Sequence, residues 1–207
     1  MDRLFTIPGI WSGGFYEMTL CLGEPCAGGL SEALDVVWNS NMLRGPFQSR
    51  DIEPEEQQPV HEILDVGGHL YGVARFQGFE LPCGTYSIRE ENAEGQPLAD
   101  FVSLYFPLSA IGRHFPVGAY PFADYQAAGR WRTLIDGWFL DVLRDLKDRL
   151  HFAVCAIGWE PELTAKNVEE VKKTANSVDR FDGVVLQAEG ELRWFPPTRF
   201  DILTLKS

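Results

Sequence analysis

Alternating apolar and polar residues predict strands along much of the chain. In segment 13–22, large apolar side chains fall on one face and Glu17 and Thr19 on the other, as a half-buried strand requires. Later segments that are apolar or alternating are also predicted as strands: 70–76, 85–90, 101–106, 152–157, 183–188 and 191–195. Short turns separate the middle segments, and Glu189-Gly190 joins the last two as a hairpin turn. We therefore expect a mainly antiparallel sheet.

Helical periodicity predicts one long core helix and two shorter helices. The long helix covers about residues 130–150, where large apolar residues recur at three- and four-residue steps: Trp131, Leu134, Ile135, Trp138, Val142, Leu146 and Leu150. The shorter helices are predicted over about 31–39, with Ser31 as a candidate N-cap, and over about 164–176. The strand, helix and strand within 152–188 suit one right-handed parallel crossover.

Two segments lack both periods and are predicted as loops. Residues 40–60 form a long acidic loop, and residues 112–129 form a structured loop rich in glycine, proline and aromatic residues. The chain has 207 residues, 45% of them hydrophobic, and no internal repeat, which suits one packed core. The sequence thus predicts a single α+β domain over residues 1–207.

Neither export nor membrane insertion is indicated by the sequence. The apolar run at the N-terminus is interrupted at Pro8, and no uninterrupted apolar stretch approaches the roughly 18 residues that cross a bilayer. The four cysteines are sparse for a disulfide framework, so free thiols are expected. We expect a cytoplasmic protein with no membrane contact.

Negative charge is concentrated in the first half of the chain. Residues 1–103 contain 16 acidic and five basic residues, whereas residues 104–207 contain 14 acidic and 13 basic ones. Such a field repels phosphate backbones and attracts basic proteins, which disfavours nucleic acid as a partner. A solvated acidic face that only improves solubility explains the same numbers.

Known motifs for catalysis, metals and nucleotides are missing. His61, Glu62 and His69 lack the helical H-E-x-x-H spacing that places two imidazoles over zinc, and the cysteines lack the spacing of a thiolate zinc site. The sequence contains no P-loop, no Rossmann fingerprint and no G-x-S-x-G. It therefore assigns no catalytic residue, no metal and no cofactor.

The candidate binding residues are aromatic and acidic residues in or beside predicted loops. Loop aromatics supply rigid contact area and are enriched in recognition surfaces, although they also close the ends of sheets. The residues predicted to contribute to binding are Trp11, Glu53, Glu55, Glu56, Tyr120, Phe122, Trp159 and Glu160.

The function expected from these features is that of a non-enzymatic binding protein. Its acidic face would meet a basic protein partner, in the manner of an inhibitor or immunity-type protein, with electrostatic steering of the encounter. The alternative is an enzyme with an aromatic-lined pocket that uses carboxylates or His61 and His69. A third interpretation is a subunit that assembles with copies of itself, since the sequence does not decide the oligomeric state.

Overall fold

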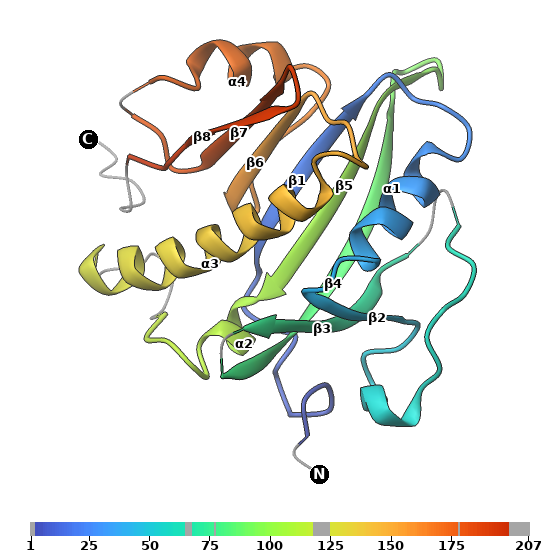
Figure 1. Ribbon diagram of the computed structural model, residues 1–207, viewed down its shortest axis with the longest axis vertical. Coiled ribbons are helices and arrows are strands. Elements are labelled where there is room, and N and C mark those ends of the chain that lie inside the picture. The colour runs from blue at the N-terminus through green and yellow to red at the C-terminus, as the bar shows by residue number, and fades with distance from the viewer. Residues whose placement is uncertain (1–2, 65–67, 77, 118–124, 178, 199–207) are drawn as a thin grey trace.

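The computed structural model describes residues 3–64, 68–76, 78–117, 125–177 and 179–198 (Figure 1). The strands are β1 (Phe15–Gly23), β2 (Leu43–Phe47), β3 (Leu70–Phe76), β4 (Phe79–Glu91), β5 (Pro97–Pro107), β6 (Val154–Trp159), β7 (Gly183–Ala188) and β8 (Glu191–Phe195). The helices are α1 (Gly29–Trp38), the 3-10 helix η1 (Pro54–Glu56), α2 (Leu108–Ile111), α3 (Tyr125–Leu146) and α4 (Val168–Thr174). None of these helices is both long and apolar enough to cross a bilayer.

The described strands form one eight-stranded sheet in the order β2-β3-β4-β5-β1-β6-β7-β8. Each neighbouring pair runs antiparallel, which confirms the α+β class and the mainly antiparallel sheet. The predicted parallel crossover is wrong, because β7 pairs antiparallel with β6 directly. The chain between them, including α4, therefore returns to the same end of β6 at which it left.

The predicted helix boundaries need correction. α3 begins at Tyr125, inside the segment predicted as a loop, and ends at Leu146. α1 begins at Gly29, with Gly28 rather than Ser31 as the N-cap. Gly28 has a φ of 77°, which glycine tolerates better than other residues, so the turn before the helix can close earlier.

The third predicted helix, over 164–176, is shortened to the seven residues of α4. Its first residues form a turn instead, in which the Asn167 side chain accepts a hydrogen bond from the Thr164 backbone N–H at 2.8 Å. This side-chain bond competes with helical geometry, as asparagine commonly does. Asn167 is consequently the N-cap of α4.

The strand β2 lies inside segment 40–60, which the sequence predicted as a loop. Gly45 and Pro46 interrupt any alternation there, so no strand pattern is visible. β2 pairs only with β3 and forms an edge of the sheet, where a proline without an N–H donor is tolerated. η1 follows within the same segment.

α1 and α3 cover one face of the sheet and form the main core with it (Figure 1). The predicted apolar face of the long helix is buried there, except that Leu134 is 56% exposed. Met18, Leu104 and Ile157 are buried sheet residues of this face. At about 1.5–3 kcal/mol for each large apolar side chain removed from water, α3 is a major stabilising element.

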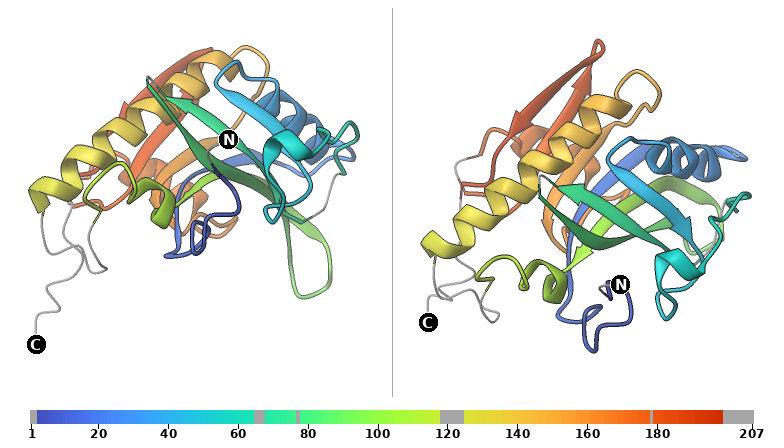
Figure 2. Two further views of the ribbon diagram at one scale, coloured as in Figure 1. Left: turned by 90° about the horizontal axis from the view of Figure 1, so that it is seen from below. Right: turned by 60° about the horizontal axis from the view of Figure 1, so that its bottom comes forward.

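The described residues cover the opposite face of the sheet at its two sides. Segment 163–175, which includes α4, packs on strand residues such as Phe101 and Val154. At the other side, Phe5 of the N-terminal segment packs on Phe47 and Val73. Figure 2 shows the N-terminal segment below the sheet and α3 above it. Between these two covers lies a central strip of the sheet, on which neither of them packs.

Candidate functional site

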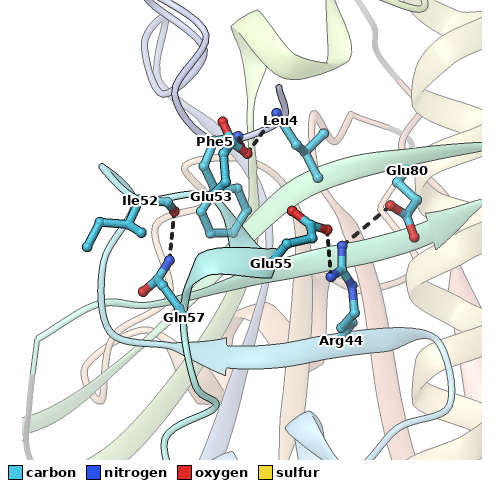
Figure 3. Close-up of polar contacts among 8 residues, drawn as sticks. All are labelled: Leu4, Phe5, Arg44, Ile52, Glu53, Glu55, Gln57 and Glu80. Carbon is cyan, nitrogen blue, oxygen red and sulfur yellow. Dashed lines mark hydrogen bonds and ion pairs between the residues drawn. The ribbon is translucent and has the colours of Figure 1, made fainter. Parts of the chain in front are cut away.

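The acidic loop after β2, here residues 51–57, is held in a defined conformation by Gln57. The Gln57 amide nitrogen donates to the carbonyl oxygens of Ser49 and Ile52, both at 2.7 Å, and its oxygen accepts from the Ser49 N–H at 3.0 Å. Three hydrogen bonds from one side chain thus close the loop around η1. Figure 3 shows Gln57 bonded to Ile52 beside Glu53 and Glu55.

Glu53 fastens the N-terminal segment to this loop (Figure 3). Its carboxylate accepts hydrogen bonds from the backbone N–H groups of Leu4, Phe5 and Thr6 at 2.9–3.0 Å and from the Thr6 hydroxyl at 2.6 Å. Desolvation raises the pKa of Glu53, but these four donors outweigh it and lower the pKa to about 2. Glu53 is therefore an ionised structural anchor.

Glu55 is also engaged within the molecule. The Arg44 guanidinium on β2 lies 3.0 Å from the Glu55 carboxylate and 3.6 Å from that of Glu80 on β4 (Figure 3). The side chains remain 30–47% exposed, so the pairs hold the loop against the sheet but contribute little stability each. Arg44 thus joins η1 to two strands.

A depression of about 440 Å³ opens over this loop. Its lining consists of Arg3, Thr6, Asp51, Ile52, Glu53, Glu55 and Glu56. Asp51 and Glu56 are exposed, and among the described residues neither carboxylate has an ion-pair partner. The structure therefore brings together three of the predicted binding residues, Glu53, Glu55 and Glu56, and leaves Glu56 and the newly identified Asp51 with free carboxylates.

The predicted aromatic binding residues do not join this depression as one surface. The Trp11 indole donates to the Phe5 carbonyl at 3.0 Å and packs edge-on against Phe5, so it supports the N-terminal segment. Trp159 is half-buried and packs against the main core at the end of β6. Tyr120 and Phe122 lie outside the described residues.

Glu160 occupies a different place, on the central strip of the sheet. It has a φ of 40°, and its carboxylate accepts a hydrogen bond from the Phe15 N–H at 3.2 Å. It follows β6 directly and lies beside the first residues of β1. The predicted acidic residues thus separate into two places, with Glu53, Glu55 and Glu56 on the acidic loop and Glu160 on this strip.

The strip contains a row of polar and aromatic residues that was not predicted from the sequence. The residues directly opposite one another on β3, β4, β5, β1 and β6 are Tyr71, Gly84, Tyr105, Glu17 and Gly158, here called the tyrosine row. A Cβ at Gly84 would lie 2.4 Å from the Tyr105 ring, so the absence of a side chain at Gly84 allows that ring to lie over the neighbouring strand β4. The Tyr105 hydroxyl reaches His69 Nδ1 at 2.8 Å.

Glu17 is the buried titratable group of the tyrosine row. Glu17 is only 4% exposed, and its carboxylate accepts a hydrogen bond from the Tyr86 hydroxyl at 2.9 Å. Burial raises the pKa of Glu17 to about 7, with Tyr86 opposing and the carboxylates of Glu160 and Asp182 adding to the shift. The Asp182 carboxylate reaches this place because Gly158 has no side chain to occupy it.

The histidines do not assemble a metal centre with these carboxylates. Burial and the charge of Arg50 lower the pKa of His69, which therefore stays neutral near pH 7. His61 is exposed in the segment before β3. Within the described ranges, no group of three or more histidine, cysteine, aspartate or glutamate side chains is arranged to hold a metal ion.

Comparisons with protein-family models, with curated proteins and with solved structures find no match to this chain. Its function is therefore inferred from the geometry above.

Proposed function

We propose that this chain is a binding protein that holds a basic protein partner on its acidic loop, residues 51–57. The observation that carries the proposal is the open depression of about 440 Å³, whose lining includes four carboxylates and one arginine. A basic side chain that enters it meets a negative field from several directions. Carboxylate-lined surfaces of this kind favour cationic partners and increase association rates.

Rigidity of the loop supports the same proposal. Glu53 and Gln57 together make seven hydrogen bonds to the backbone and to Thr6, so the loop is ordered before a partner arrives. A preordered surface avoids part of the entropic cost of binding. Asp51 and Glu56 would then supply the charge that the partner meets, while Glu53 and Glu55 hold the frame.

The distribution of charge over the rest of the molecule also supports binding of a basic partner. Arg44 and Arg89, which pair with Glu55, Glu80 and Asp100, come from the same acidic half of the chain as their partners. Loop 23–28, α1 and loop 51–60 follow one side of the molecule, away from α4 and β8 (Figure 1). The proposal therefore extends to an inhibitor or immunity-type protein that acts in the cytoplasm.

The alternative, an enzyme, is favoured by Glu17, whose pKa of about 7 suits a general acid or base. Tyr86 covers this carboxylate through their hydrogen bond, and residue 17 is only 4% exposed. A reacting atom would need to displace Tyr86 to reach it. The exposed acidic loop requires no such rearrangement, and for this reason we favour binding.

The test uses the full chain as bait to capture a partner from its native cell, followed by purification of that partner. We expect the Kd to rise between low and about 0.15 M ionic strength, because exposed charges are screened. The double variant Asp51→Asn/Glu56→Gln should weaken binding at least tenfold, which corresponds to about 1.4 kcal/mol.

The matched control removes the same charge elsewhere, with Glu170→Gln on α4 and Glu191→Gln on β8, both exposed. Because these two carboxylates lie away from the acidic loop, the control should leave the Kd within about twofold of the original value. Binding that is insensitive to salt, or that both double variants weaken equally, would show that the acidic loop is not the docking surface.

A further inference from the structure

A second cavity lies beside the acidic loop and differs from it in character. It has a volume of about 330 Å³ and lies between the N-terminal segment, β2, β4 and the residues at and after α2. Its apolar lining residues are Leu4, Ile7, Ile10, Leu81, Pro82 and Ala110. The volume is at the small end of the range for ligand sites, which usually combine apolar walls with a few placed polar groups.

The two carboxylates at this cavity are partly compensated by one arginine. Glu55 and Glu80 both line it, and both are paired with Arg44, which lies between them (Figure 3). One guanidinium thus compensates much of the charge of the two carboxylates. A ligand entering the cavity meets this paired cluster at one wall.

Two further guanidinium groups line the cavity, those of Arg3 and Arg113. Both residues are exposed, and in the described part of the chain neither has an ion-pair partner. Their charges therefore remain available to an anionic ligand. A guanidinium binds a carboxylate with two parallel hydrogen bonds, which makes arginine the residue suited to recognise this group.

His114 completes the same wall and stacks on Phe79, with ring centroids 4.2 Å apart. Burial and the charge of Arg113 lower the pKa of His114, so the ring remains neutral near pH 7. A neutral imidazole has one N–H donor, which can add a hydrogen bond to a ligand.

We infer that this cavity binds a small organic acid, with its apolar body on the partly exposed side chains of Leu4 and Ile7 and its carboxylate on Arg3 and Arg113. Such a carboxylate has two sources, a free small-molecule acid or the C-terminal residue of a peptide. Arg3 and Glu55 line both this cavity and the acidic depression. The inference nevertheless does not require a basic partner on the acidic loop, because it concerns a ligand of the opposite charge that is tested on the chain alone.

The experiment is a calorimetric titration of the full chain with hexanoate, 1-hexanol and hexylamine. We expect saturable binding of hexanoate at one site and at least tenfold weaker binding of the alcohol and the amine. The variant Arg3→Gln/Arg113→Gln should weaken hexanoate binding at least tenfold, while Arg193→Gln on the opposite edge strand β8 should leave it unchanged. Ile7→Trp, which places a large ring at a half-buried wall, should also abolish binding.

The source of the carboxylate is decided by two peptides that end in leucine, one with a free carboxylate and one amidated. Tighter binding of the free peptide than of hexanoate assigns a peptide C-terminus, and the reverse order assigns a small-molecule acid. The inference is overturned if hexanoate shows no saturable binding, if the alcohol binds equally well, or if the double arginine variant binds hexanoate as the unmodified chain does.

Discussion

Replacement of Glu17 by glutamine should make the protein more stable at neutral and alkaline pH. Glu17 is buried beneath Tyr86, and its pKa is raised from 4.5 to about 7. One pKa unit corresponds to about 1.4 kcal/mol, so the ionised carboxylate costs about 3 kcal/mol above pH 7. Glutamine has nearly the same shape, keeps an oxygen that can accept from Tyr86, and is never charged. The substitution removes this cost.

The direction of the pH dependence follows from the raised pKa. Between pH 4.5 and about 7 the folded chain holds a proton on Glu17 that the unfolded chain has released. The stability contributed by this group is therefore complete below pH 4.5 and is lost as pH rises through about 7. The difference in the free energy of unfolding between Glu17→Gln and the unmodified chain should grow by about 3 kcal/mol over this range.

The measurement is urea unfolding followed by tryptophan fluorescence at several pH values from 4.5 to 8. Asp182, with a pKa raised to about 6 by burial, titrates in both proteins. The difference between them therefore reports Glu17 together with its coupling to the Asp182 charge. Glu56→Gln, at an exposed position, is the control and should give a curve parallel to that of the unmodified chain. A difference that stays constant within about 1 kcal/mol would refute the assigned pKa.

Two further substitutions test the hydrogen bonds of Glu53 and the close packing at Gly84. Glu53→Ala removes an acceptor of four hydrogen bonds and should lower the free energy of unfolding by about 2–3 kcal/mol and speed proteolysis of the N-terminal segment. Because the pKa of Glu53 is lowered to about 2, this loss should be full above pH 4.5 and fade as pH falls towards 2. Gly84→Ala places a methyl group 2.4 Å from the buried Tyr105 ring and should cost about 1–3 kcal/mol in urea unfolding. By contrast, Gly137→Ala in α3 meets no atom within 4 Å and should stabilise by up to about 1 kcal/mol, so equal effects of the two substitutions would contradict the close packing at Gly84.

Local patterns in the sequence located most of the regular elements. Segments 70–76, 183–188 and 191–195 coincide with β3, β7 and β8, because short apolar or alternating runs bounded by turn residues are typical of strands. The apolar period of 130–150 likewise located most of α3. Where glycine and proline interrupt the pattern, as in β2, the period gave no signal and the strand was missed.

Strand order and register were decided only by the tertiary structure. Glu17, Tyr86 and Tyr105 lie on separate strands, and their meeting depends on strand pairing between distant residues: Tyr86 is 69 positions and Tyr105 is 88 positions from Glu17. A two-residue period is the same for any neighbour and any register, so it does not show which side chains share a row.

The acidic half of the chain illustrates the same division. The sequence determined how many carboxylates it contains, and this count holds for any fold. Only the folded chain shows that Glu53 bonds to backbone N–H groups up to 49 residues away, while Asp51 and Glu56 remain exposed. Ionised groups interact over distances that folding sets, and therefore the tertiary structure decides which charges anchor the loop and which face a partner.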